Sequence, residues 1–326
     1  MKFTKKDLVM LYRNLVAAQA YDQFCIRMAM QGKLLSFYHS SAGGEAPGVG
    51  GTTFLKPDDI IYRHLRGHGV PHMIGKGASI PEYLAEHCGK ITGCSRGLGG
   101  IHPSYPELGI YGTGATLGSQ FPLSVGWGLA AKKKKKGQVV VIFTGDGTMG
   151  RGTWHEAANI AALWKLPVIY VCENNHIAQY VEFKDAYPFE NMSRLPAAFG
   201  IPYEEVDGQD VIAVATAVSG AVEKARKGKG PAFIECHTAR FGSHGVGNPN
   251  KVGGKPRSEK ELEELKKRDS IEICRKRLLK DKVLTKKDVE RIAAEVAEEV
   301  ANAEIFIDES PIQDDPAELA PALYAP

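Results

Sequence analysis

Two apolar runs near the middle of the chain, 138–143 and 167–173, are typical of buried strands, because both are short and rich in Val and Ile. Between them, Trp154, Ala157 and Ala161 recur at helical spacing. The order strand, tight turn, helix, strand predicts one parallel crossover unit. The carboxyl ends of parallel strands meet at one edge of a sheet, and open α/β sheets bind their ligands there.

Further predicted elements extend this pattern on both sides. Strands are predicted at 201–206 and 232–238, and a helix over 210–226 carries its Val and Ala residues on one face. The fold class is therefore α/β, with a central, mostly parallel sheet and helices on both faces. The Gly-, His- and Pro-rich residues 36–125, with a helix near 80–89, are expected to contain functional loops.

Helical segments are also predicted at both ends of the chain. An N-terminal helix covers residues 4–31, and Thr4 followed by Asp7 forms a capping box at its start. Loop 240–257 is rich in glycine and is expected to be mobile. The arm 258–326 is expected to contain two capped helices followed by an extended, Pro-rich tail.

Composition and charge favour a folded cytoplasmic protein. The chain has 326 residues, of which 43% are hydrophobic and 24% charged, which suits one large domain or two small ones. A net charge of +3 is too small to indicate a nucleic-acid partner. The sequence has no apolar stretch of membrane-spanning length, and we expect no signal peptide because the N-terminus is charged and lacks an apolar core. Six scattered cysteines without a CxxC pair favour free thiols in a reducing cytoplasm.

A motif suited to a metal and a phosphate follows the two central strands. Gly145-Asp146-Gly147 comes after the first strand, and Asn174-Asn175 comes after the second. Carboxylate and amide oxygens are hard ligands that suit Mg²⁺ or Ca²⁺. The glycines expose backbone N–H groups at a helix start, which suits phosphate. The structural alternative is an ordinary βαβ unit with turn residues, and the functional interpretation is a metal-bound diphosphate.

The block from Gly145 to Asn175, which includes HEAANIAALWKLPVIYVCENN, resembles the alpha subunits of thiamine diphosphate (ThDP)-dependent 2-oxo acid and acetoin dehydrogenases. The resemblance runs from about residue 8 to the C-terminus, and the short chain is similar to the bacterial pyruvate and acetoin types. It implies that residues 1–326 form a single diphosphate-binding domain with the ThDP-binding fold. It also implies an oxidoreductase that cleaves a 2-oxo acid or acetoin and transfers the acyl group to a lipoyl carrier.

The resemblance also assigns the ligands of the metal and the diphosphate. It implies that Asp146, Asn175 and the backbone carbonyl of Ile177 bind Mg²⁺. The turn that faces the phosphate groups is implied to consist of Gly145, Gly147 and Thr148.

The segment HLRGHGV is similar to a second diphosphate-binding element of the family. Arg66 matches the arginine that holds the diphosphate, and His68 matches the histidine that follows it. Leu65 departs from the family pattern, which has Tyr or His at this position, so a hydrogen bond to the cofactor is missing or is supplied elsewhere. A surface ion pair is the structural alternative for Arg66.

The glycine-rich segment YGTGATLGSQFPL is similar to the family element that lies beneath the thiamine. The resemblance implies that Ala115 and Leu117 clamp the aminopyrimidine, and that the Leu117 side chain supports the bent cofactor. Its glycines do not fit the GxGxxG spacing of a nicotinamide site. A structural glycine-rich turn is the alternative.

Two histidines are implied to be catalytic. His244 lies in RFGSHGVGNP, which resembles the family loop over the thiazolium, and an imidazole there can handle protons. His39 precedes GGEA at the spacing of a family histidine that lines the substrate channel. Each has an ordinary loop histidine as its alternative. The departures around them are Gly44, Gly242, Gly245 and Asn248; Gly245 replaces the serine that is phosphorylated in mitochondrial relatives, so we expect no such switch.

The resemblance implies partners as well. In the family, a glutamate of the beta subunit activates the cofactor, and this sequence offers no candidate for that residue. We therefore expect an α2β2 assembly with a beta subunit, bound to a lipoyl acyltransferase, and an inactive chain on its own. Two rival interpretations remain: a split transketolase- or decarboxylase-type ThDP subunit, and a catalytically silent ThDP-binding scaffold.

Overall fold

The computed structural model describes residues 2–113 and 116–314, and within this part five parallel strands form one central sheet in the order β1-β2-β3-β7-β6. The sheet strands are β1 (Ile60–Tyr62), β2 (Val140–Gly145), β3 (Val168–Asn174), β6 (Tyr203–Asp207) and β7 (Ala232–His237). The helices are α1 (Lys5–Met30), α2 (Glu45–Thr52), α3 (Val70–Lys76), α4 (Ile80–His87), α5 (Gln120–Lys134), α6 (Gly152–Leu163), α7 (Phe183–Ala186), α8 (Arg194–Ala197), α9 (Val211–Arg226), α10 (Glu259–Lys266), α11 (Ser270–Lys280) and α12 (Lys286–Glu309). Two small hairpins are formed by β4 (Ile177–Ala178) with β5 (Val181–Glu182), and by β8 (Lys251–Val252) with β9 (Lys255–Pro256).

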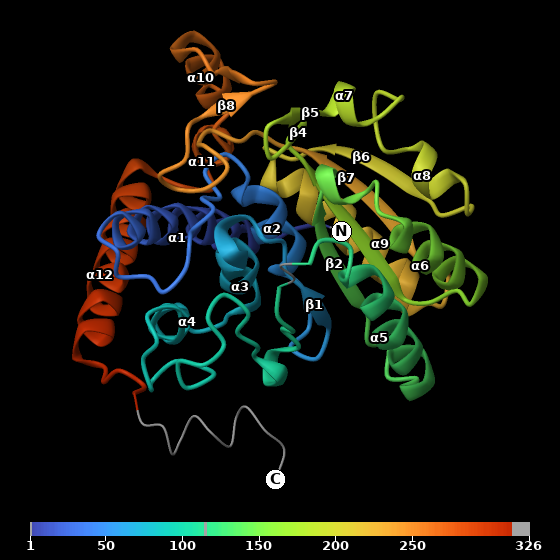
Figure 1. The fold of residues 1–326 in the computed structure, drawn as a ribbon, viewed down its shortest axis with the longest axis horizontal. Helices are drawn as coiled ribbons and strands as arrows, with labels where there is room; N and C mark the ends of the chain where they lie inside the picture. The colour runs from blue at the N-terminus through green and yellow to red at the C-terminus, as the bar shows by residue number, and fades with distance from the viewer. Residues whose placement is uncertain (1, 114–115, 315–326) are drawn as a thin grey trace.

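Helices cover both faces of the sheet, as Figure 1 shows, so the predicted α/β class with a central parallel sheet is confirmed. Successive side chains of a strand point to opposite faces. In β2, Val141 and Phe143 pack in a core with residues of α1, α3, α4 and α9. Val140 and Ile142 pack in a second core with α5 and α6. Both sets are apolar because both faces of the parallel sheet are buried.

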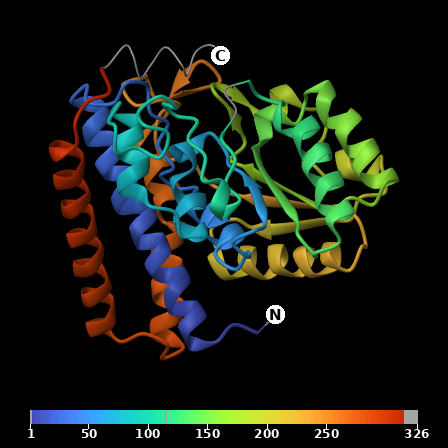
Figure 2. The same cartoon turned by 90° about the horizontal axis from the view of Figure 1, so that it is seen from below.

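The long helices α1 and α12 lie side by side at the edge of the molecule, away from the sheet (Figure 2). The predicted N-terminal helix and its capping box are confirmed. The backbone N–H of Thr4 donates to Asp7 Oδ2 over 2.8 Å, and the N–H of Asp7 donates to Thr4 Oγ1 over 3.2 Å. These bonds satisfy two of the N–H groups that a helix start leaves unpaired.

Several elements were not predicted from the sequence pattern, among them α2, α3, α5, β1 and α11. Strand β1 has three residues, too few to show an alternation, and it lies inside the stretch interpreted as loops. Helix α11 begins after Asp269, whose carboxylate accepts the N–H groups of Ile271 and Glu272. The two capped helices predicted for the arm correspond to α10, capped by Ser258, and α12, capped by Thr285, and α12 continues to Glu309.

Segment 240–257 contains the β8–β9 hairpin and is tied to its surroundings by backbone hydrogen bonds. The N–H of Phe241 donates to Ala42 O over 3.0 Å, and that of Val246 donates to Tyr38 O over 2.8 Å. The mobility expected for segment 240–257 stays a prediction. The last part of the predicted arm, 315–326, lies outside the described residues. Among the described helices, none has both the length and the apolar character needed to cross a bilayer.

Candidate active site

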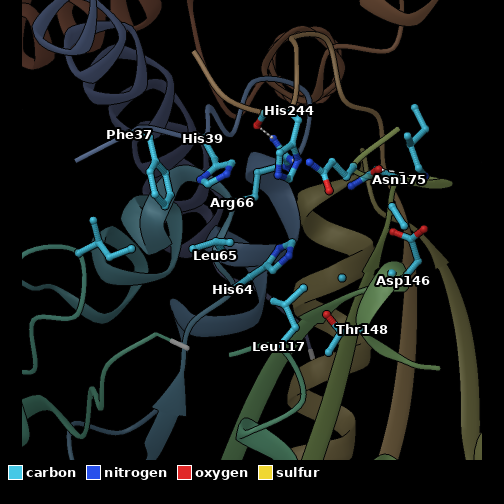
Figure 3. A pocket seen from close by; sticks show the side chains of 16 residues that line it. Phe37, His39, His64, Leu65, Arg66, Leu117, Asp146, Thr148, Asn175 and His244 are labelled. Carbon is cyan, nitrogen blue, oxygen red and sulfur yellow. Dashed lines mark hydrogen bonds between the residues drawn. The ribbon is translucent and has the colours of Figure 1, made fainter. Parts of the chain in front are cut away.

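A cavity of about 460 Å³ lies at the carboxyl ends of β2 and β3 (Figure 3). Its size is typical of small-molecule sites, and its position is where open α/β sheets bind ligands. The walls combine residues that are far apart in the sequence. The predicted site residues that line it are His39, Arg66, Leu117, Gly145, Asp146, Gly147, Thr148, Asn175, Ile177 and His244.

The side chain of Asp146 has a buried oxygen without a partner. Asp146 is 2% exposed, and its Oδ2 accepts no hydrogen bond within the described structure. Burial raises the pKa of Asp146 to about 6, although His64 and Arg66 favour its ionised form. A buried carboxylate oxygen without a donor is costly, and a cation would compensate it. The unpartnered Oδ2 of Asp146 is therefore an atom that a bound metal ion would satisfy.

Asn175 and Ile177 lie beside Asp146 in the cavity wall. Asn175 Oδ1 accepts the N–H of Ile177 over 3.2 Å, which leaves a second lone pair on the amide oxygen. The neighbouring Asn174 is fixed by a bond of 2.6 Å from its Nδ2 to Glu235 Oε1. A carboxylate, an amide oxygen and a carbonyl are hard ligands that fit Mg²⁺ bound together with phosphate oxygens. No group of three or more His, Cys, Asp or Glu residues in the described chain could hold a metal by itself.

The Gly-Asp-Gly turn is packed closely against the segment that carries these ligands. A Cβ atom at Gly147 would lie 2.6 Å from the Cβ of Ala178, so only glycine fits without a shift. The hydroxyl of Tyr187 donates to the carbonyl of Asp146 over 2.5 Å. Thr148 is buried, and its side chain is in the cavity wall. The turn residues therefore lie where their backbone N–H groups suit a phosphate.

Arg66 extends into the cavity from the short 3-10 turn Arg66–Gly69. Gly67 and Gly69 have positive φ angles of 63° and 81°, which glycine adopts without strain. Arg66 Nη1 donates to Ser40 O over 3.1 Å. Burial lowers the pKa of Arg66, but a guanidinium remains charged near neutral pH. Arg66 is thus a fixed cation facing the cavity.

The rings of His39 and His244 are in edge-to-face contact in the cavity lining, with centroids 4.7 Å apart. Burial lowers the pKa of His39 to about 3, and Arg66 contributes to this shift. Burial, together with Arg66, lowers the pKa of His244 to about 4. Both imidazoles are therefore neutral at pH 7, and neutral imidazoles can both accept and donate hydrogen bonds.

The segment that carries His39 is fixed to α1 by the carboxylate of Asp22. Asp22 Oδ1 accepts the Tyr38 hydroxyl and the Ser41 N–H, both over 2.7 Å. Its Oδ2 accepts the Ser40 hydroxyl over 2.7 Å. Asp22 is 1% exposed, so these bonds replace its hydration. This wall of the cavity is therefore held rigidly.

His68 is fully buried and lies behind His39, outside the cavity wall. Its ring is bonded to His39 on one side and to His87 on the other, both over 3.1 Å. It therefore can reach a ligand only through His39. Ala115 lies outside the described residues, whereas Leu117 is 38% exposed at the cavity wall.

The pair formed by His64, in the cavity lining, and the buried Glu173 was not predicted from the sequence. His64 lines the cavity, and its Nδ1 lies 2.7 Å from Glu173 Oε2. Glu173 Oε1 accepts from His72 Nε2 over 2.8 Å. Burial alone would raise the pKa of Glu173, but the two imidazoles outweigh it and lower the pKa to about 2. A glutamate directly before Asn174, at the end of a predicted buried strand, was the available signal.

Comparison with known proteins identifies the family. Residues 13–315 match the model of the dehydrogenase E1 component. The chain belongs to this family. This E1 component is 34% identical to the alpha subunit of acetoin:2,6-dichlorophenolindophenol oxidoreductase from Bacillus subtilis (strain 168), over 99% of this chain and 95% of the relative.

Two pyruvate dehydrogenase E1 alpha subunits are similarly related to this E1 component. The Rhizobium meliloti (strain 1021) protein is 34% identical, over 96% of this chain and 89% of the relative. The chloroplastic alpha-3 subunit of Arabidopsis thaliana is 33% identical, over 94% of this chain and 72% of the relative. The resemblance noted in the sequence is thus confirmed, as is the class of oxidoreductase component. Membership of the family implies ThDP as the cofactor.

Proposed function

We propose that this chain is the alpha subunit of a Mg²⁺- and ThDP-dependent dehydrogenase that cleaves a 2-oxo acid or acetoin and transfers the acyl group to a lipoyl carrier. The observation that carries the proposal is the unpartnered, buried Oδ2 of Asp146, which faces the same cavity as Asn175 and Arg66. A cation bound to that oxygen would neutralise phosphate groups, and a guanidinium would hold them from the side.

Each part of the cavity has a role in this proposal. Asp146, Asn175 and the carbonyl of Ile177 would hold Mg²⁺, and Gly145, Gly147 and Thr148 would contact the diphosphate with Arg66. Leu117 and Ala115 would support the aromatic rings. When bound, ThDP supplies the carbon nucleophile and the electron sink for cleavage of a carbon–carbon bond.

The histidines of this chain would act on the substrate. His244 and His39 are neutral, so they can exchange hydrogen bonds with substrate oxygens without bringing a charge into the cavity. His68 would act through His39, since its ring is bonded to the His39 ring.

A beta subunit is part of the proposal. Asp146 is the only carboxylate among the described residues that line the cavity, and its proposed role is metal binding. A carboxylate that activates the cofactor would therefore come from another chain. Phe37 and Leu117, 62% and 38% exposed, give the rim an apolar surface that suits a protein partner. We propose an α2β2 assembly that binds a lipoyl acyltransferase in the cytoplasm.

Calorimetric titration tests the proposal directly. ThDP with Mg²⁺ is titrated into the chain alone, into its complex with the beta subunit, and into a complex that carries Asp146→Asn. We expect tight binding only to the wild-type complex, with loss of binding on chelation of the metal. Absence of binding to the wild-type complex would refute the cofactor assignment.

Turnover separates the remaining alternatives. A complex that binds ThDP but consumes neither pyruvate nor acetoin would favour the silent scaffold. Release of free aldehyde, or transfer of glycolaldehyde units, without reduction of an electron acceptor would favour the decarboxylase or transketolase type. The match of residues 13–315 to the dehydrogenase E1 component is the observation that speaks against both alternatives.

A further inference from the structure

Three neighbouring strands bring His64 beside the Gly-Asp-Gly turn. β1 pairs in parallel with β2, and β2 pairs with β3 so that Gly145 lies opposite Glu173 in the register. His64 follows the end of β1 by two residues and lies at the same edge of the sheet. Its side chain is 13% exposed, and its ring is directed into the cavity, between Arg66 and Leu117 in the view of Figure 3. Strand pairing thus brings one more polar side chain to the proposed phosphate site.

Glu173 orients the ring of His64 and decides which of its nitrogens is left for a ligand. His64 Nδ1 lies 2.7 Å from Glu173 Oε2. This carboxylate is ionised and only accepts hydrogen bonds, so Nδ1 carries a proton. The other oxygen, Oε1, accepts from His72 Nε2 over 2.8 Å, which keeps the carboxylate from turning away. The nitrogen of His64 that remains available in the cavity is therefore Nε2.

The backbone that carries His64 is fixed by the residue before it. Arg63 is 1% exposed, and its guanidinium donates to His68 O over 3.0 Å and to Pro103 O over 2.7 Å. The carbonyl of Arg63 accepts the hydroxyl of Thr113 over 3.2 Å. The ring of His64 is therefore held in place before any ligand arrives, and a ligand that binds to it does not have to order a free side chain.

The free nitrogen of His64 lies against the turn whose backbone N–H groups suit a phosphate. A Cβ atom at Gly145 would lie 2.9 Å from His64 Nε2, so the two are separated only by the space that a side chain would fill. Nε2 forms no hydrogen bond with any of the described residues. Asp146, Thr148 and Arg66 line the same cavity. An unpaired ring nitrogen beside a fixed cation and a glycine turn is suited to the oxygens of an anion.

We propose that His64 is a further ligand of the diphosphate, which it binds from Nε2 while Glu173 orients the ring through Nδ1. The inference rests on the proposed function and extends its cofactor site. A phosphate oxygen only accepts hydrogen bonds, so the bound ring carries a proton on each nitrogen. The carboxylate on one side and the phosphate on the other both favour this imidazolium form. His64 thus contacts the cofactor, and Glu173 is a positioning residue.

His64 would supply a contact that the next residue cannot make. Leu65 lines the cavity with an apolar side chain, which forms no hydrogen bond with a phosphate. His64 and Arg66 flank it in the chain, so one short segment would bring two cations to the diphosphate. Hydrogen bonds between charged partners are stronger than neutral ones, and we expect the contact from His64 to change the affinity roughly 10–100-fold.

Two substitutions at His64 separate the contact in the cavity from the bond to Glu173. His64→Asn places an amide nitrogen near the position of Nδ1, keeps a donor for Glu173, and has no atom at the position of Nε2. His64→Gln can bring its amide nitrogen to the position of Nε2 and gives up the donor for Glu173. Calorimetric titration of ThDP with Mg²⁺ into the α–β complex measures the affinity, and thermal unfolding of the cofactor-free complex measures the stability.

We expect His64→Asn to bind ThDP with Mg²⁺ roughly 10–100-fold more weakly than the wild type, with a similar Tm. His64→Gln should bind more tightly than His64→Asn and yet have a lower Tm, because Glu173 Oε2 loses its donor. A purely structural role for His64 predicts the reverse order of affinities, and that order, or wild-type affinity in His64→Asn, would overturn the inference. His155→Asn, at an exposed histidine of α6, is the matched control and should bind as the wild type does.

A crystal structure of the wild-type α–β complex with ThDP and Mg²⁺ tests the contact without any substitution. We expect a phosphate oxygen within about 3.2 Å of His64 Nε2. A water molecule or an atom of the thiamine rings at that place would overturn the inference and leave the proposed function intact. Absence of binding to the wild-type complex in the titration would count against the proposed function, and against the inference with it.

Discussion

Replacing Gly147 by alanine tests whether the metal site depends on the close packing of the Gly-Asp-Gly turn. A Cβ at position 147 would lie 2.6 Å from the Cβ and 3.2 Å from the Cα of Ala178. Ordinary contacts between carbon atoms are about 3.5–4.0 Å, so Ala178 has to move by roughly 1 Å. Ala178 follows Ile177 in β4, and the carbonyl of Ile177 is a proposed metal ligand.

The expected magnitude follows from the geometry that Mg²⁺ demands. Its ligands lie at about 2.0–2.1 Å, and a displacement of ~1 Å removes one of them. We expect the affinity for ThDP with Mg²⁺ to fall roughly 10–100-fold, the range seen when the support of a metal ligand is lost. Overpacking should also lower the free energy of unfolding by about 1–3 kcal/mol.

Calorimetric titration of the α–β complex measures the affinity, and thermal unfolding of the cofactor-free complex measures the stability. Gly152→Ala is the matched control, because a Cβ there meets no atom within 4 Å and Gly152 begins α6. This control should bind the cofactor normally. Wild-type affinity and an unchanged Tm in Gly147→Ala would refute the coupling between the turn and β4.

Three further substitutions test the site and its surroundings. Asp146→Ala should abolish binding of ThDP with Mg²⁺ in calorimetric titration, and near-normal affinity would remove Asp146 from the metal site. His244→Ala should keep the cofactor affinity and lose about 100-fold or more in overall rate, and an unchanged steady-state rate would exclude it from the mechanism. Burial lowers the pKa of His87 from 6.5 to about 4, so the unfolded chain takes up a proton that the folded chain does not, and stability falls as the pH drops from 6.5 toward 4. His87→Gln should remove about 3 kcal/mol of this pH dependence in urea unfolding, and an identical pH profile would contradict that origin.

The parallel core could be predicted because its signals are local. The runs that became β2 and β3 are apolar on both faces, and Thr4 with Asp7 marks the start of α1 by two hydrogen bonds within one turn. Strand β1 gives no such signal, since its three residues are a strand only because they pair with β2. Tertiary pairing, and not local propensity, decides its conformation.

In the candidate site, too, residues with local sequence signals could be predicted, whereas those placed by tertiary contacts could not. The residues that meet in the cavity were predicted from their places after strands and from the family motifs, and the structure brings ten of them into the lining of one cavity. The position of His68 could not be read from the sequence, because the turn Arg66–Gly69 directs its ring into the core and not toward the cavity. The role of Glu173 depends on His64 and His72, which lie more than a hundred residues earlier in the chain.

The strand order has a consequence for how the protein is synthesised. β7 hydrogen-bonds to β3 on one side and to β6 on the other, yet it follows both in the chain. A nascent chain on the ribosome that has not reached residue 232 therefore has β3 with an unpaired edge, and β6 without a neighbour in the sheet. Unpaired apolar strand edges associate with other chains. Premature termination before Ala232 is thus expected to yield fragments that aggregate and have no residual cofactor site, whereas termination after the described helix α12 leaves the whole sheet paired.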